Sequence, residues 1–504
     1  KLTGNTTKVI GIVKGVRQER NIPVSKLDMY KKAGWTEVNP KKKPVPKGTP
    51  TITWSDGTTM KGKVESEEVR TREKPTSVVL KLQKEFGTNL NIYYGDTLEI
   101  LKKIIEKFNI NEVFSNKIFK NIYLNDLDLN LKNFFISKNV KWNFYNQFGI
   151  QLNHRERYKW SANWNKFINS ELTTGKSNCK FLFDQKLDNF DIIETNEIDN
   201  KFIQKGGRKH ALELLDSFLE SRSENYQKEM SSPLTGEKSC SRLSPHITYG
   251  NVSLKEIYNK TKKKINTIQS YSNKKSLLAF KSRLAWHCHF IQKLYDEPEI
   301  EFNNLNKAYD GLRENDFDED HFLAWKKGKT GFPFVDACMR YLIKTGWINF
   351  RMRAMLVSFA SYQLWLDWKK TSKHMAKLFT DYEPGIHYSQ FQMQSGTTGI
   401  NSIRIYNPIK QSFDQDVDGK FIRKWVPELR SVPDKLVHEP WKLTYLDQKG
   451  LGIEIGTDYP SPIVDNKIST KLAKDKIWNI KKSTKSKILS KEILNKHASL
   501  SLRR

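Results

Sequence analysis

The sequence predicts an α/β domain followed by a large all-helical domain. From about residue 88 to 150, strand-like and helix-like segments alternate, which is typical of α/β organisation. From about residue 205 to 445, long amphipathic patterns dominate and strand patterns are scarce. The 504 residues also exceed the ~250–300 residues at which single hydrophobic cores stop growing, so two or more domains are expected.

Residues 1–78 differ in pattern from the rest of the chain. A loop rich in proline and lysine precedes the segment TITWSDGTTM, residues 51–60. Asp56 and Gly57 form a typical turn pair between two extended runs, so this segment is predicted to be a β-hairpin. No chemistry is assigned to residues 1–78.

The α/β region is predicted to begin with strand, helix and strand. The strand candidates are LNIYYGD (90–96), NEVFSN (111–116) and VKWNFYNQFGI (140–150). Between the first two, TLEILKKIIEKFNI (97–110) places apolar residues at helical spacing, with Thr97 as the expected cap.

The rest of the chain is predicted to comprise a linker, a helical domain and a tail. Residues 151–204 are polar and irregular, which indicates the linker. Amphipathic periodicity predicts helices at residues 208–220, 252–265, 276–295 and 334–346. The last part, 446–504, is expected to be a basic C-terminal tail, because residues 466–504 hold twelve Lys and Arg against two acids.

Composition limits the class of protein. The formal net charge of +30 favours a polyanionic partner such as nucleic acid. No run of ~18 apolar residues occurs, so no membrane span is expected. The N-terminus lacks a secretory signal, and without an initiator Met the chain is expected to be a fragment or a processed product. The four cysteines form no CxxC pair, which argues against metal and disulfide sites and favours a cytoplasmic setting.

Two local patterns suggest ion binding at first sight. Asp414, Asp416 and Asp418 alternate before Gly419, as in an EF-hand loop, but the twelfth position is Trp425 instead of Glu, so calcium is not expected. The pair His287 and His289 falls on different faces of a predicted helix. Packing and local hydrogen bonds are the expected roles of these two histidines.

Five stretches from residue 239 to 441 occur in a fixed order. They are SCSRLSPHITYGNVS, AWKKGKTGFPFVDACMRYLIKTGWINFRMRAM, FTDYEPGIHYSQFQMQSGTTG, RIYNPIKQSFDQDVDGKFIRKWVPEL and LVHEPW. Together they resemble the FAD-binding helical domain of the photolyase/cryptochrome family. The aspartate-rich segment matches the family pattern D-x-x-G-x-F-I-R-x-W-x-P-E-L, which implies a structural turn leading into a helix.

The resemblance implies a set of FAD-binding residues. The segment at the FAD phosphates comprises Ser241, Arg242, Leu243 and Ser244, and Tyr226 is a further contact. The ion pair beside the isoalloxazine is Arg353 and Asp381, a second acid is Glu383, and the residue facing flavin N5 is His387. A hydroxyl and a guanidinium suit a pyrophosphate. An imidazole at position 387 is expected to make the flavin environment pH-dependent.

The resemblance also locates the substrate pocket of a photolyase, which stacks a flipped pyrimidine lesion between aromatic walls. Trp286 matches one wall and Met393 the other, while Arg283 stands where an acidic residue is usual. Phe350 and Ala354 occupy the positions of the histidines that act on 6-4 lesions. The type of lesion therefore does not carry over.

A third implication concerns the reduction of the flavin along a chain of three tryptophans. Trp368 matches the middle member. Phe391 replaces the proximal one, and the distal position falls near Asn315. An alternative route through Trp365, Tyr382 or Tyr388 stays open.

The match to the family starts partway through its Rossmann-like domain. We therefore expect five parts: an atypical segment 1–78, a partial Rossmann-like domain 79–150, a linker 151–204, the FAD-binding domain 205–445 and the tail 446–504. An antenna chromophore is not expected.

Three functions stay open at this point. The first is light-dependent repair of UV-damaged DNA with FAD as cofactor. The others are a cryptochrome-like blue-light receptor and a nucleic-acid-binding protein without photochemistry. The protein is expected to be a monomer.

Overall fold

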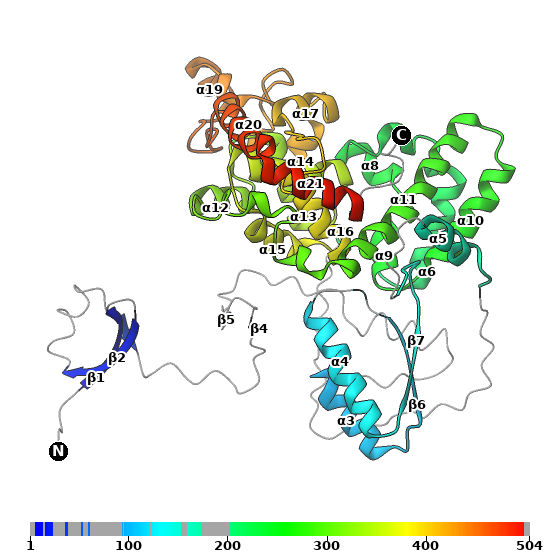
Figure 1. Cartoon of the computed structure of the whole chain (residues 1–504). Coiled ribbons are helices and arrows are strands. Elements are labelled where there is room, and N and C mark those ends of the chain that lie inside the picture. Colours follow the sequence, from blue (N-terminus) through cyan, green and yellow to red (C-terminus); the bar gives the residue numbers. More distant parts are fainter. Residues whose placement is uncertain are drawn as a thin grey trace. The chain divides into compact units, whose positions relative to one another are not determined.

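The computed structural model describes residues 6–13, 16–23, 36–38, 52–53, 59–60, 93, 95–117, 119, 122–152, 159–172 and 202–497. The chain divides into two compact units, Lys1–Arg70 and Thr71–Arg504. Each unit is described by itself (Figure 1).

The first unit contains short antiparallel sheets. Strand β1 (Thr6–Val13) pairs with β2 (Val16–Pro23) on one side and β3 (Thr36–Val38) on the other. Strands β4 (Ile52–Thr53) and β5 (Thr59–Met60) pair in the register Ile52↔Met60. The hairpin predicted in this segment is confirmed, while its turn residues lie outside the described part of the chain.

The second unit begins with a small α/β region. Helix α3 (Thr97–Lys107) is followed by β6 (Glu112–Asn116), α4 (Ile122–Ser137) and β7 (Lys141–Tyr145). Strands β6 and β7 run parallel, so they need a crossover connection, which α4 provides. The predicted strand 90–96 lies mostly outside the described residues.

Two details of this region differ from the sequence-based expectation. The cap of α3 is Asp96, whose carboxylate accepts from the Glu99 N–H at 3.0 Å, and Thr97 is the first helical residue. The third predicted strand is wrong beyond Tyr145. There the chain leaves the sheet because Phe148 and Ile150 are buried against the helical domain, with the Phe148 ring 4.8 Å from His287.

The helical domain is built around one long helix, α11 (Tyr271–Asp296). The four predicted helices are confirmed as α6 (Arg208–Ser217) with its π-helical extension η3 (Phe218–Arg222), α10 (Leu254–Thr267), α11 and α13 (Pro333–Thr345). Short helices α7 (Tyr226–Glu229), α8 (Pro233–Ser239) and α9 (Ser244–Thr248) lie between η3 and α10.

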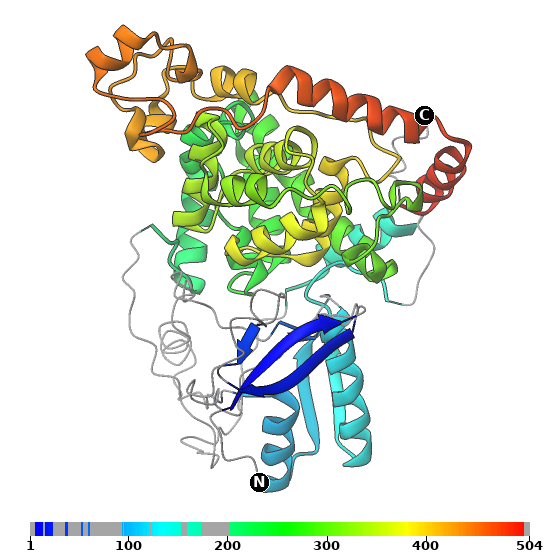
Figure 2. The same ribbon diagram turned by 90° about the vertical axis from the view of Figure 1, so that its left-hand side faces the viewer.

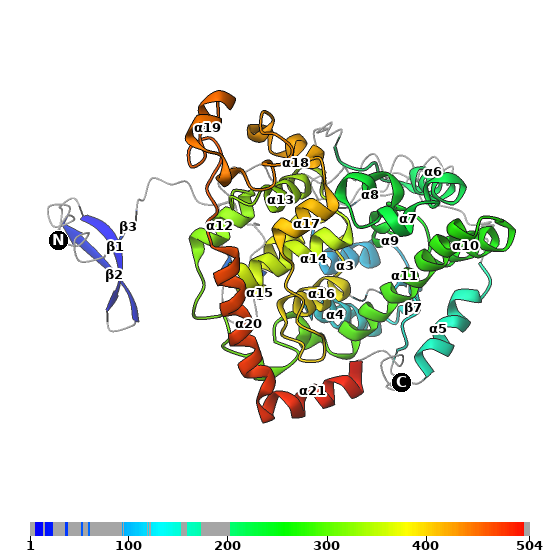
Figure 3. The ribbon, with the colours of Figure 1, turned by 90° about the horizontal axis from the view of Figure 1, so that it is seen from above.

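After α11 the chain forms the main hydrophobic core. The elements are η4 (Pro298–Glu301), η5 (Lys307–Tyr309), α12 (Glu319–Lys327), α14 (Phe350–Ser358), η6 (Phe359–Gln363), α15 (Trp368–Leu378), α16 (Pro384–Ser395), α17 (Pro408–Gln415), α18 (Lys420–Trp425), η7 (Pro427–Leu429) and η8 (Pro440–Lys442). Helices α16 and α11 run side by side (Figure 3). A Cβ at Gly385 would lie 2.6 Å from the Ile291 Cα, so glycine permits this close approach.

The expected linker and tail both contain packed helices. In the linker, α5 (Trp160–Asn169) buries Trp164 and Ile168. In the tail, α19 (Tyr445–Leu451), α20 (Asn466–Lys482) and α21 (Thr484–His497) follow one another. The last two lie along the outside of the helical domain (Figure 2), with Ala473, Ile477 and Ile493 turned inward and buried.

Among the described residues, no helix has both the length and the apolar content that a membrane crossing requires.

Candidate functional site

The centre of the candidate site is a buried ion pair between Arg353 and Asp381. Arg353 lies on α14, and Asp381 lies in the turn between α15 and α16. The two guanidinium Nη atoms donate to the two carboxylate oxygens at 3.0 and 2.8 Å, and the Asp381 side chain is 3% exposed. A third bond from the Arg353 Nε to the Ile348 carbonyl, at 2.7 Å, fixes the plane of the guanidinium. Pairing with the Arg353 guanidinium through two hydrogen bonds compensates the charge of the buried Asp381 carboxylate.

His387 lies near this pair, on the first turns of α16. Its ring packs against the rings of Phe391, Tyr382, Tyr388 and Phe379. Burial lowers the pKa of the imidazole to about 3, although a bond to the Ser372 carbonyl at 3.0 Å opposes the shift. The ring is therefore neutral at physiological pH, with Nε2 as the N–H that donates to Ser372. The expected pH dependence of position 387 is wrong for the physiological range.

Glu383 is the N-cap of α16 and is buried, with 6% exposure. The His387 N–H donates to the Glu383 carbonyl at 2.8 Å. The sequence-predicted acid therefore lies one helical turn from His387, on the same helix as Phe391 and Met393.

The segment 241–244 is held by a second arginine, Arg222, which the sequence did not single out. The Arg222 guanidinium donates to the carbonyls of Cys240 and Ser241 and, at 2.7 Å, to that of Leu214. No spacing or motif around residue 222 indicates this role, since it depends on a turn that forms only in three dimensions.

Arg242 itself has a left-handed backbone, with φ of 62°. A residue with a side chain adopts this conformation at a cost of ~1–3 kcal/mol unless its surroundings hold it. Here the Arg242 guanidinium stacks 3.9 Å from the centre of the Trp347 ring, and its Nε donates to the Gln204 side chain at 3.2 Å. Leu243 is buried, with 1% exposure, and Ser244 begins α9.

Three guanidinium groups act on the Cys240 thiol. The charges of Arg242, Arg222 and Arg353 favour its thiolate, although burial dominates and raises the pKa of that thiol to about 11. The positive charge of Arg242, within the segment 241–244, suits an anionic cofactor with phosphate groups.

Tyr226 and Arg283 lie near each other, although the resemblance implies different roles for them. Tyr226 lies on α7, 8% exposed, and packs edge-on against Phe218 and Phe280. Burial raises the pKa of Tyr226 to about 12, and the nearby Arg283 opposes this shift. Arg283 therefore belongs to the neighbourhood of α7 as well as to the surface of α11.

The residues predicted to line a substrate pocket lie on α11, α14 and α16, and α16 packs against both of the other helices. Trp286 on α11 is 42% exposed, and its ring lies 5.6 Å from that of His289 and 5.7 Å from that of Phe290. Phe350, at the start of α14, is 57% exposed, whereas Ala354 is buried. Met393 on α16 is half-buried.

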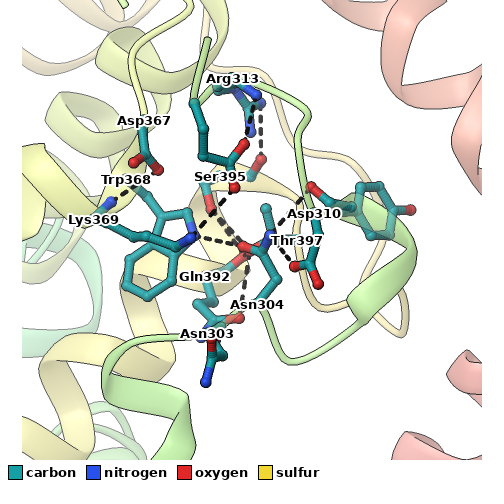
Figure 4. A network of polar contacts seen from close by, with 12 residues as sticks. Asn303, Asn304, Asp310, Arg313, Asp367, Trp368, Lys369, Gln392, Ser395 and Thr397 are labelled. Carbon is teal, nitrogen blue, oxygen red and sulfur yellow. Dashed lines mark hydrogen bonds and ion pairs between the residues drawn. The ribbon is translucent and has the colours of Figure 1, made fainter. Parts of the chain in front are cut away.

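Trp368 is buried inside a polar network (Figure 4). Its indole N–H donates to the Asn304 side chain at 2.7 Å, and Asn304 in turn donates to Asp310 at 2.9 Å. The indole ring is thereby fixed in one position. Phe391 packs 4.6 Å from the His387 ring, and Asn315 is exposed.

The three aromatic residues left open as electron donors differ in their surroundings. Trp365 has two cations over its ring, Arg313 at 4.5 Å and Lys476 at 4.6 Å. Tyr382 donates to the Tyr388 hydroxyl at 3.3 Å, and Tyr388 donates to the Glu301 carboxylate at 3.4 Å. The phenols thus form a hydrogen-bonded chain that ends on a base.

The aspartate-rich stretch forms a turn and the start of α18. The Asp416 carboxylate accepts from the N–H groups of Phe421 and Ile422 at 2.8 and 2.9 Å. Asp414 pairs with Lys410, and Asp418 pairs with Lys420. The predicted turn leading into a helix is confirmed. Within the described residues, no group of three or more His, Cys, Asp or Glu could hold a metal ion.

Comparisons with known proteins give the class of this site. Residues 280–479 match the model of the FAD binding domain of DNA photolyase. A deoxyribodipyrimidine photo-lyase of Alkalihalophilus pseudofirmus is 34% identical over 270 residues, which cover 53% of this chain and 54% of that protein. Cryptochrome-2 of Arabidopsis thaliana is 32% identical over 266 residues, covering 51% of this chain and 43% of that protein.

A solved structure extends the match. The bacterial class III photolyase from Agrobacterium tumefaciens aligns with a TM-score of 0.66 and 27% identity, covering 81% of this chain and 86% of that one. The helical region is therefore similar to the FAD binding domain of photolyases and cryptochromes, and FAD is the cofactor that this domain indicates. The chain spans about half the length of the curated relatives that it matches.

Proposed function

We propose that the protein is an FAD-dependent enzyme that repairs UV-induced pyrimidine lesions in DNA under blue light. Bound FAD supplies the electron that reaches the lesion after light absorption. The observation that carries the proposal is the exposure of Trp286. A large aromatic face left open on a helix packed against α16 suits the stacking of an extruded base.

We assign the FAD contacts as follows. Ser241, Arg242 and the backbone around Leu243 and Ser244 bind the phosphates, with Tyr226 as a further contact. Arg222 positions this segment through the carbonyl groups that it binds. Support comes from the guanidinium of Arg242 and the hydroxyl group of Ser241, which suit a pyrophosphate.

A second group of residues lies at the redox-active end. Arg353 and Asp381 hold a fixed charge pair there, and Glu383 adds a second carboxyl group. The neutral imidazole of His387 presents no charge of its own, because its pKa is low. The protein thus sets the polarity of the flavin environment mainly through the Arg353–Asp381 pair.

Electrons for flavin reduction are proposed to pass through Trp368 and the phenol pair Tyr382 and Tyr388. A phenol gives up an electron readily only if its proton moves to a base, and Glu301 is such a base for Tyr388. The two cations over Trp365 oppose a positive charge on that ring. We therefore place Trp365 outside the route.

The binding of damaged DNA tests the proposal. Holoprotein should bind a UV-irradiated oligonucleotide more tightly than the same oligonucleotide before irradiation. Trp286→Ala should lose that preference, since removal of one stacking face costs ~1–3 kcal/mol, or about 5- to 150-fold. The matched control is Tyr271→Ala, which removes an aromatic residue that is 81% exposed on the same helix. Equal affinity of the wild type for both DNAs would contradict the proposal.

A second candidate is a cryptochrome-like blue-light receptor without repair activity. The pocket itself favours it: Met393 supplies no aromatic wall, and Arg283 replaces an acid. Such a receptor should retain FAD but show no preference for irradiated DNA. A light-dependent change in hydrogen exchange of the helical domain would then be its signature.

A further inference from the structure

The outer surface of α20 and α21 has no role in the site described above. The two helices hold ten lysines against Asp475 and Glu492, which gives a net charge of +8 with His497 neutral. Only one face of the pair is packed, through Ala473, Ile477 and Ile493. We refer to the exposed face of residues 466–497 as the lysine face.

Among the residues that the structure describes, few acidic side chains pair with the lysine face. Lys476 pairs with Asp316 at 3.6 Å, and Lys496 pairs with Glu297 at 2.8 Å. Within the described part of the chain, no ion pair involves the following residues: Lys467, Lys471, Lys474, Lys482, Lys485, Lys487 and Lys491. Seven unpaired like charges on two short helices repel one another, and a polyanion relieves this repulsion.

The far end of α21 is anchored beside α11. Glu297, the C-cap of α11, binds Lys496 and His497 of α21. Asn306 adds a bond to the Ser490 hydroxyl at 3.0 Å. These contacts hold the lysine face in a fixed position relative to α11.

The anchor and Trp286 lie about three helical turns apart along α11. Glu297, the C-cap of α11, follows Trp286 by eleven positions, and eleven residues of an α-helix rise ~16 Å along its axis. The end of α21 that Glu297 binds therefore lies ~16 Å along the α11 axis from position 286. Duplex DNA carries about one negative charge per 1.7 Å of its axis, so ~16 Å of duplex corresponds to about nine phosphates.

We propose that the lysine face of α20 and α21 is a second DNA-binding surface, which holds the phosphate backbone of the duplex that flanks the lesion. The inference rests on the proposed function, because it requires a lesion at Trp286. Because the lysine face would contact phosphates, it would distinguish neither base sequence nor damage. It raises the affinity for any duplex and helps to retain the DNA while the lesion is in the pocket.

The composition of the lysine face favours DNA over a lipid surface. A helix that lies in a membrane interface separates a wide apolar half from a polar half. Here the exposed apolar residues, Ile468, Leu472 and Trp478 on α20, alternate with lysines on the same face. The Lys481 ammonium lies 5.3 Å from the centre of the Trp478 ring, so the indole is itself part of the basic surface.

The test is the salt dependence of binding to undamaged duplex DNA. The variant K471Q/K482Q/K487Q/K491Q removes four charges at exposed positions, and Lys→Gln keeps helix propensity nearly constant. If each lysine contacts one phosphate, the slope of log K against log salt should become shallower by about 3–4. The matched control K260Q/K262Q/K263Q/K264Q removes the same charge from α10.

Each outcome bears on the inference. A shallower slope in the α20–α21 variant with an unchanged slope in the α10 control supports it, and the preference for irradiated DNA should persist. Equal effects of both variants would mean that only net charge matters, and an unchanged slope in the α20–α21 variant would also overturn the proposal. Charge-dependent binding to phosphatidylglycerol vesicles with an unchanged DNA slope would assign the surface to lipid. A wild type that binds no DNA would overturn the proposed function as well.

Discussion

At the scale of single residues, Arg353 binds both the backbone of the candidate site, at Ile348, and the carboxylate of Asp381. Three of its donors are used by the protein itself, one for Ile348 and two for Asp381. Its side chain is 24% exposed, and the guanidinium lies 4.2 Å from the centre of the Phe379 ring. One face of a charged plane is thus covered by an aromatic ring, while the edge is fixed by carboxylate oxygens.

The first prediction concerns the partner of Arg353. Asp381→Asn should lower the fraction of purified protein that carries FAD, because the Arg353 charge is left without a compensating carboxylate. Breaking a buried pair costs about 3–5 kcal/mol. Flavin absorbance per protein, measured after gel filtration, checks this.

A second ion pair provides the matched control. Arg340 binds Glu428 through two bonds of 2.8 and 2.9 Å, outside the proposed FAD site. Glu428→Gln should destabilise the fold without lowering the flavin content of the folded fraction. Full FAD retention in Asp381→Asn would contradict the assignment of the pair.

At the scale of secondary-structure elements, the turn before α18 has a residue pattern that occurs both in calcium-binding loops and in structural turns. Three alternating aspartates suggest an ion loop, but the missing Glu at the twelfth position argues for a structural turn. The structure agrees, because Asp416 uses both oxygens to accept backbone N–H groups at the start of α18.

The second prediction follows from these bonds. Asp416→Ala should lower the free energy of unfolding by about 1–2 kcal/mol, as loss of a helix-capping carboxylate does. Asp414→Ala removes only an exposed pair with Lys410 and should cost under about 0.5 kcal/mol. Thermal unfolding, measured with calcium and with a chelator, checks the stability losses of the two variants and tests for calcium binding. A rise in Tm with calcium that is lost in Asp416→Ala would restore the ion-loop interpretation.

The helices show which parts of the fold are predictable from the sequence. The periodicities of α10, α11 and α13 are long and regular, so their positions agree with the prediction to within a few residues. Helix α5 was missed, although Trp160, Trp164 and Phe167 have helical spacing, because the polar residues around them indicate a linker. The sequence predicts a tail at α20 and α21, because the many lysines there outnumber the buried apolar residues Ala473, Ile477 and Ile493.

The candidate site also contains residues that are predictable from the sequence and residues that are not. The motif positions predicted the pair of Arg353 and Asp381 correctly, because α14 and the turn between α15 and α16 bring the two residues together. Arg222 was not predictable, since it acts on carbonyl groups and so leaves no side-chain pattern. The neutral state of His387 was also not predictable, because the low pKa arises from burial that only the packed structure provides.

At the scale of the whole molecule, the proposed function combines a strong positive charge with light-driven chemistry. The net charge of +30 favours binding to any nucleic acid, and the lysine face carries part of that charge. Neither the charge nor the absorption of light identifies a lesion. In the proposed function, specificity for damage depends on Trp286 and on the bound flavin, and so on a reaction as well as on binding.

The measurement that tests this account most directly is light-driven repair by protein whose flavin has been reduced chemically without oxygen. Chemical reduction makes the result independent of the route through Trp368 and the tyrosines. The reduced protein is mixed with an oligonucleotide carrying UV lesions, illuminated with blue light, and lesion loss is compared with a dark control. We expect loss of lesions in the light alone, and less of it with Trp286→Ala. Unchanged lesions in the light, with reduced FAD still bound, would contradict the account and favour the photoreceptor.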